Sequence, residues 1–240
     1  MTPLSSYLLG GELASKGILF VVATPIGNLK DITLRALEVL KEVDFIIAED
    51  TRKAKGLLSH YDIRKPVISL HRHSPKSRVE QIIRKIEKGE NAALISEAGT
   101  PAISDPGEEL IRCCGERNIK TIPIPGPSAI TTALSVSGMP AQTFSFFSFL
   151  PRRKSKRRKF LKEIKGYPHT LVFFEAPHRI IETLEDIEEV MGDRKIVLCR
   201  ELTKIHEEIF RGKVSETLGM LREKGAKGEL TIVLEGCLSP

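Results

Sequence analysis

Residues 18–29 read Ile-Leu-Phe-Val-Val-Ala-Thr-Pro-Ile-Gly-Asn-Leu, an uninterrupted apolar run followed by a loop. Such a run is typical of a parallel strand that is buried on both faces. Alternating segments follow it. We expect strands at 45–48, 67–70, 92–96 and 120–124, and helices at 31–43 (capped by Asp31), 51–61, 77–88, 106–117 and 128–137. This repetition predicts an α/β domain with a mostly parallel sheet between helices.

The alternation breaks at Gly138-Met139-Pro140 and then resumes. The second half predicts strands at 144–149, 170–175, 195–201, 208–211 and 230–235, with helices at 178–191 and 214–224. We therefore expect two α/β domains, at 17–138 and 141–240, after a mobile tail at 1–16.

Charge is concentrated in one segment. Residues 152–159 read Arg-Arg-Lys-Ser-Lys-Arg-Arg-Lys, whereas the whole chain of 240 residues has a net charge of +6, so the remainder is nearly neutral. This segment predicts a polyanionic partner, and we favour nucleic acid over membrane because no aromatic-anchored amphipathic helix adjoins it. The alternative is a solvated, lysine-rich helix start.

Composition indicates a cytoplasmic location. The apolar fraction is 41%, but no apolar run is long enough to span a bilayer, and the first 16 residues lack the pattern of a secretory signal. The four cysteines have neither zinc-ligand nor redox-motif spacing, so we expect no metal.

Four loops follow predicted strands, where open α/β sheets bind ligands. They lie at 24–29, 48–52, 96–107 and 123–130, and the third and fourth are rich in Gly, Pro and small residues that expose backbone groups. Each alone also fits an ordinary turn or helix cap. In the second half, polar clusters at 175–179, 200–204 and 227–229 suggest a polar cleft, with surface salt bridges as the alternative.

Read in order, these segments resemble one family. They are Thr-Pro-Ile-Gly-Asn-Leu (24–29), Ala-Glu-Asp-Thr-Arg (48–52), Ser-Glu-Ala-Gly-Thr-Pro (96–101), Ser-Asp-Pro-Gly (104–107), Pro-Gly-Pro-Ser-Ala (125–129), Phe-Leu-Pro (149–151), Phe-Glu-Ala-Pro-His-Arg (174–179) and Arg-Glu-Leu-Thr-Lys (200–204). The chain resembles the ribosomal RNA small-subunit methyltransferase I family, of the tetrapyrrole-methylase-like fold class, from about Ile18 to Gly236. Glu97 stands where the family typically has Asp, and Ala176 where it often has Ser.

The resemblance implies a class III methyltransferase that uses S-adenosylmethionine to methylate a cytidine 2′-hydroxyl in the decoding region of 16S rRNA. It implies a mostly parallel N-terminal sheet, a mixed C-terminal sheet, a cofactor cleft between the domains, a homodimer, and the small ribosomal subunit as partner. The rivals are a tetrapyrrole methyltransferase and a non-enzymatic RNA-binding protein.

We assign candidate residues to three roles. The predicted cofactor contacts are Pro25, Gly27, Ser96, Glu97, Ala98, Gly99, Ile103, Ser128, Ala129 and Gly228. A 2′-hydroxyl must lose its proton, so the catalytic candidates are Glu175, His178, Glu201 and Lys204, with Lys204 either a base of depressed pKa or a stabiliser of the alkoxide. The predicted RNA contacts are Arg152, Arg153, Lys154, Lys156, Arg157, Arg158, Lys159 and Arg179.

Overall fold

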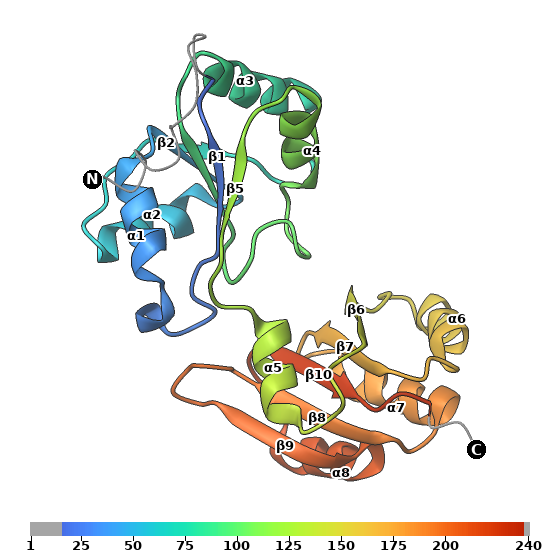
Figure 1. Cartoon of the computed structure of the whole chain (residues 1–240). Helices are drawn as coiled ribbons and strands as arrows, with labels where there is room; N and C mark the ends of the chain where they lie inside the picture. The colour runs from blue at the N-terminus through green and yellow to red at the C-terminus, as the bar shows by residue number, and fades with distance from the viewer. Residues whose placement is uncertain (1–15, 238–240) are drawn as a thin grey trace. The chain divides into compact units, whose positions relative to one another are not determined.

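The computed structural model describes residues 16–237 (Figure 1), so most of the tail expected at 1–16 lies outside the described residues. The chain divides into two compact units, and the boundary between them in the sequence lies between Ser128 and Ala129. The sequence placed this division near residue 140 instead. The difference is helix α5 (Ala129–Ser137), which packs against strand β10 of the second unit and accepts a hydrogen bond from Arg211 Nη2 on the Val136 carbonyl oxygen (2.6 Å).

The first unit contains a five-stranded parallel sheet, as the alternation predicted. Its strands are β1 (Leu19–Val22), β2 (Phe45–Ala48), β3 (Val67–Ser69), β4 (Ala92–Ile95) and β5 (Thr121–Ile124). Their order is β3-β2-β4-β1-β5, so β1 lies between β4 and β5. Because all the strands are parallel, the loops that follow them leave from a single edge.

Helices cover both faces of this sheet. They are α1 (Leu34–Glu42), α2 (Thr51–His60), α3 (Lys76–Glu87) and α4 (Glu108–Glu116). Apolar side chains of α1 and α2 form one core with the sheet, and those of α3 and α4 form another on the opposite face. These two cores hold the strands rigid, which fixes the loops at their ends.

Two helix starts differ from the sequence prediction. Asp31 ends a short 3-10 helix, η2 (Leu29–Asp31), and α1 is capped instead by Thr33, whose Oγ1 accepts a hydrogen bond from the Ala36 backbone N–H (3.1 Å). The fourth helix begins at Glu108 rather than 106, because Gly107 adopts a φ of 134° at its N-cap. In both places the N-cap residue, Thr33 or Gly107, determines where the helix begins.

The second unit contains a mixed five-stranded sheet in the order β6-β7-β10-β8-β9. Its strands are β6 (Phe144–Phe149), β7 (Thr170–Glu175), β8 (Lys195–Arg200), β9 (Glu208–Lys213) and β10 (Leu230–Leu234). Strands β6 and β7 are parallel, whereas β10 runs antiparallel to both β7 and β8. Consequently β6, β7 and β8 all end at the edge where β10 begins.

Three further helices pack on this sheet: α6 (Lys154–Ile164), α7 (Ile180–Met191) and α8 (Val214–Lys224). The sequence analysis did not assign α6, which spans most of the basic segment. Its buried residues Arg157, Leu161 and Ile164 repeat every three or four positions and face the core. One of the seven cations therefore occupies a core position.

Candidate functional site

The loops after β1 and β4 leave neighbouring strands toward opposite faces of the first sheet. The first loop leads to α1, on one core, and the second leads to α4, on the other. Such a point in an open parallel sheet leaves a crevice beyond the strand ends, where ligands bind. Strand β5 pairs with β1 on the side away from β4, and the loop that follows β5 therefore begins next to the loop that follows β1.

A backbone pair joins two of these loops. Thr24 and Gly99 exchange both of their backbone hydrogen bonds, at 2.9 and 3.0 Å, and the Ser96 hydroxyl donates to the Gly99 carbonyl oxygen (2.8 Å). Gly99 has a φ of 81°, and a Cβ there would lie 3.3 Å from Ile26 Cγ2. The loop after β5 packs just as closely against the loop after β1, because a Cβ atom added at Gly126 would lie 3.0 Å from the Cβ atom of Ala23. The loops thus present bare backbone in a fixed geometry.

The segment that continues to α4 is unusually constrained. Ala102 and Ser104 both have positive φ, at 65° and 69°. The Ser104 hydroxyl is buried and has no hydrogen-bond partner, and its carbonyl oxygen accepts from Arg72 Nη2 (3.2 Å). Strained non-glycine residues and an unpaired buried hydroxyl are features found at ligand-binding loops. Ser104 begins the Ser-Asp-Pro-Gly motif but is not among the predicted cofactor contacts, because the isolation of its hydroxyl is a property of the folded loop.

The predicted cofactor residues on these loops differ in burial. Pro25, Ser96 and Gly99 are buried, Ser128 and Ala129, the first residue of the second unit, are half-buried, and Gly27, Glu97, Ala98 and Ile103 are exposed. The chain bends at Ile26 and Gly27, and Gly99 has a positive φ. The carboxylate of Glu97 forms an ion pair with the Lys53 ammonium.

Acidic side chains gather at this edge. Burial, reinforced by repulsion from Glu49 and Glu97, raises the pKa of Asp105 to about 6, and Arg72 opposes the shift. A site with carboxylates that repel one another favours a positively charged ligand.

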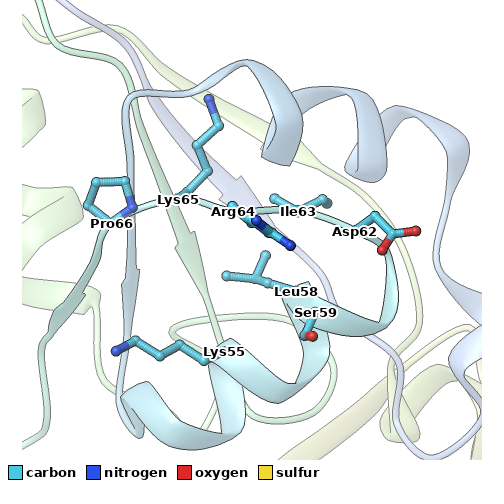
Figure 2. Close-up of a pocket in the computed structure, with 8 residues that line it drawn as sticks. All are labelled: Lys55, Leu58, Ser59, Asp62, Ile63, Arg64, Lys65 and Pro66. Atoms are coloured by element: carbon cyan, nitrogen blue, oxygen red, sulfur yellow. The ribbon is translucent and has the colours of Figure 1, made fainter.

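A separate pocket of about 440 Å³ lies where α2 leads into β3 (Figure 2). Its lining includes Lys55, Arg64 and Lys65, and none of the predicted site residues. It is built from the turn that precedes β3, at the start of the strand, whereas the loops described above follow the strand ends. We assign it no part in the site.

In the second unit, strand register brings the three polar clusters to one edge. Leu230, the first residue of β10, pairs with Glu175 on one side and Arg200 on the other. The segments 175–179, 200–204 and 227–229 therefore leave or enter the sheet next to one another.

At that edge Glu201 and Lys204 form a compact charged group. Lys204 Nζ lies 2.8 Å from Glu201 Oε1 and 3.2 Å from Glu229 Oε2, and Glu201 Oε1 also accepts from the Glu229 backbone N–H (2.7 Å). Glu201 adopts a strained φ of 50°, and Gly228, at a φ of 79°, leaves the space its side chain needs, since a Cβ there would lie 2.4 Å from Glu201 Cγ. In the described structure, Gly228 thus makes room for Glu201.

The electrostatics of this group set the charge of each member. Burial lowers the pKa of Lys204, but hydrogen bonds to Glu201 and Glu229 outweigh burial and raise it overall. The hydrogen bonds from Lys204 and the Glu229 backbone lower the pKa of Glu201. Lys204 is therefore a persistent cation that suits a developing alkoxide, and the structure gives no basis for a base of depressed pKa.

Glu175 and Arg179 form an internal support. Glu175 is 2% exposed, and its oxygens accept from the Ala176 N–H (2.8 Å) and the Thr183 hydroxyl (2.7 Å). Arg179 Nη2 lies 3.5 Å from Glu175 and donates to the carbonyl oxygens of Leu150 (2.9 Å) and Pro151 (3.3 Å). With its oxygens engaged, Glu175 is no longer retained as a candidate base, and Arg179 holds the turn that leads into α6. His178, by contrast, is exposed.

The basic segment differs from the expectation in one respect. Arg157 is fully buried, and its guanidinium is paired with the buried carboxylate of Asp186, at 2.7 Å from both Nε and Nη2. The prediction that Arg157 contacts RNA is therefore wrong for this structure. Arg158 is half-buried and paired with Glu189. The remaining cations are exposed, namely Arg152, Arg153, Lys154, Lys156 and Lys159.

Two features are absent from residues 16–237. These residues contain no group of three or more His, Cys, Asp or Glu side chains arranged to hold a metal ion. Each of their helices is too short or too polar to cross a bilayer.

This architecture, an α/β unit with a parallel sheet followed by one with a mixed sheet, belongs to a known class of methyltransferases. The model of the family Tetrapyrrole (Corrin/Porphyrin) Methylases matches residues 19–218, and the chain belongs to this family. Solved structures agree on the fold. A cobalt precorrin-4 methyltransferase has a TM-score of 0.68 at 16% identity and covers 96% of this chain and 99% of its own, and a diphthine synthase has 0.70 at 17%, covering 91% and 89%.

More similar relatives define the group within the family. A protein of Thermotoga maritima is 48% identical over 92% of this chain and 99% of its own length, and one of Escherichia coli O157:H7 is 47% identical over 92% and 79%. Both are named Ribosomal RNA small subunit methyltransferase I. The chain is a methyltransferase of this group, and its methyl donor is S-adenosylmethionine.

The residues of the first unit fit that cofactor. Gly99 and Gly126 let the loops pack closely with their backbone groups exposed, the Ser104 hydroxyl lacks a partner, and the neighbouring carboxylates favour a cation. S-adenosylmethionine has polar groups to bond and a positively charged sulfonium.

Proposed function

We propose that this protein methylates the 2′-hydroxyl of a cytidine in the decoding region of small-subunit (16S) ribosomal RNA. The observation that carries the proposal is the 48% identity, over nearly the full length of both chains, to a relative named for this kind of substrate. The exposed cations of the basic segment supply the charge that an RNA substrate needs.

The residues have distinct roles in this proposal. When bound, S-adenosylmethionine supplies a methyl group already activated by its sulfonium. The loops at 24–28, 96–104 and 126–129 hold it through backbone groups. The pairing of Thr24 with Gly99 keeps the first two loops rigid and fixes the orientation of the cofactor, and alignment with the attacking oxygen supplies much of the rate. Lys204, held in place by Glu201, stabilises negative charge that develops on the 2′-oxygen, and His178 receives the proton.

The partner proposals follow from the substrate. We propose the small ribosomal subunit or its free 16S rRNA as the physiological partner, a homodimer as the active form, and the cytoplasm as the site of action. Light scattering at micromolar concentration tests the dimer, and a monomer there contradicts it.

The function is tested by incubating the protein with labelled S-adenosylmethionine and small subunits that lack the modification, followed by nucleoside analysis. Label is expected in 2′-O-methylcytidine. Parallel reactions with free 16S rRNA and with a carboxylated tetrapyrrole identify the substrate form. Label on a base or on the tetrapyrrole refutes the proposal, and no transfer with unimpaired RNA binding indicates a non-enzymatic protein. Loss of the Lys204 ammonium in a Lys204→Met variant should slow this transfer. A Lys55→Met variant, altered in the pocket of Figure 2, is the control for a general effect of losing one cation.

A further inference from the structure

Strand β6 contains an irregularity that re-aims one side chain. Its parallel pairing with β7 is regular as far as Phe146, which pairs with Val172, but the next pair is Phe149 with Phe174. One extra residue therefore lies in β6, a β-bulge, and Ser148 within it has a strained φ of 55°.

The bulge decides which face Phe149 occupies. Side chains alternate along a strand, so a regular β6 would point Phe149 to the same side as Phe147. Phe147 stacks on Phe173 in the helix-covered core (5.6 Å between ring centroids). With the bulge, Phe149 instead contacts Phe174 at 5.8 Å, and Phe146 contacts Phe174 at 4.9 Å. Three rings thus share the face away from that core.

This aromatic group lies at the edge that carries the proposed chemistry. Phe149 ends β6, and Phe174 directly precedes Glu175, so both adjoin the segment that contains His178. Phe149 is 53% exposed, whereas its two partners are half-buried. The outer ring therefore offers a flat surface to solvent and is supported from beneath.

Two arginines follow Phe149 in the sequence, and the residues between them and the ring are held in place by Arg179. Leu150 is buried, and Arg179 donates hydrogen bonds to the carbonyl oxygens of Leu150 and Pro151. Arg152 and Arg153 come next and are exposed. Three residues of extended chain span at most about 10 Å, so the ring and the first guanidinium lie within reach of one nucleotide and its neighbour.

We propose that Phe149 stacks on an unpaired base of the RNA substrate while Arg152 and Arg153 bind its phosphates. An exposed aromatic ring beside arginines is the combination that recognises single-stranded nucleic acid, because every base has a face to stack and every nucleotide a phosphate. The inference rests on the proposed function and adds that the RNA must be unpaired at this position. The adjoining arginines favour RNA over a second protein copy as the occupant of this face.

The chain contains no tryptophan, which makes a direct test possible. In the Phe149→Trp variant the single indole reports on this position alone. Titration with a single-stranded ribo-oligonucleotide of about 12 nucleotides should quench its fluorescence, with affinity close to that of the native chain. A duplex of the same sequence should quench it far less.

The matched variants are Phe149→Ala and Phe144→Ala. Phe144 lies on the same strand at the opposite edge and is 39% exposed. Phe149→Ala should weaken oligonucleotide binding roughly 5- to 150-fold, the range found for loss of one stacked base, with an unchanged salt slope because no phosphate contact is lost. Phe144→Ala should bind as the native chain does.

Several outcomes would overturn the inference. These are unchanged binding by Phe149→Ala, an equal loss in Phe144→Ala, and a loss of S-adenosylmethionine affinity in Phe149→Ala without loss of RNA affinity. A change of oligomeric state caused only by Phe149→Ala would assign the ring to a contact between copies. If the native chain binds the oligonucleotide through Phe149 but transfers no methyl to rRNA, the proposed function fails and the stacking contact stands.

Discussion

The buried pair of Arg157 and Asp186 yields the sharpest stability prediction. Both side chains are 1% exposed, so Arg157→Met would leave the buried Asp186 carboxylate with only the exposed Lys154 ammonium, 4.0 Å away, as a counter-charge. Removing one partner of a buried ion pair costs about 3–5 kcal/mol, a large share of the 5–15 kcal/mol that stabilises a typical domain. For a unit of this size that corresponds to a fall in melting temperature on the order of 10–30 °C.

Calorimetry of the whole chain measures this, with the transition of the second unit as the readout. The control is Arg158→Met, one residue along the same helix, whose pair with Glu189 is partly exposed and worth about 0–1 kcal/mol. The double variant Arg157→Met/Asp186→Leu should recover much of the loss, because it removes the unpaired charge. Equal, small changes in both single variants would refute the reasoning. The result also matters for RNA binding, because neutralising Arg157 together with its neighbours would destabilise the second unit as well as remove phosphate contacts.

Three further predictions concern the site. Gly99→Val should abolish S-adenosylmethionine binding by calorimetry, because Gly99 has a φ of 81° and its Cβ position faces Ile26 Cγ2 at 3.3 Å; unchanged affinity contradicts the placement of the cofactor. Lys204→Met should lower kcat with little change in cofactor affinity, by about 100-fold if it stabilises the alkoxide, and an unaltered kcat would remove it from the mechanism. Asp105 has a pKa raised from 3.8 to about 6, so its protonated form stabilises the fold below pH 4 and that contribution is lost as the pH rises through 6. The free energy of unfolding of the native chain, measured relative to that of Asp105→Asn, should therefore fall by about 1–2 kcal/mol between pH 4 and 7, after allowance for the partial exposure of Asp105. A difference between the two chains that stays constant with pH would show that the pKa of Asp105 is not raised.

Much of the fold was predictable because continuous apolar runs mark buried strands. The runs at 18–23 and 92–96 became β1 and β4, and the mixed second sheet agrees with the family resemblance. Helix α6 was not predicted because its charges hide an apolar stripe that only Leu161 and Ile164 reveal. Nothing local distinguishes Arg157 from its neighbours, since its burial depends on Asp186, far along the chain.

The site was predictable as loops and less so as individual residues. Motifs located the segments that strand register later joined, such as 175–179 and 200–204. The properties of single side chains depend on contacts across the fold. Glu175 is engaged internally because Thr183 lies one helix turn into α7, and Ser104 lacks a partner because of its own backbone conformation.

The chain passes from the first unit to the second only once, between Ser128 and Ala129. All five strands of the first sheet, including the central β1 and its neighbours β4 and β5, are consequently complete before any of the second unit is needed. A ribosome adding about 5–20 residues per second would therefore expose the whole first unit several seconds before it finishes the second. The order of synthesis thus allows the crevice-bearing half to fold alone, before the half with the basic segment emerges from the exit tunnel.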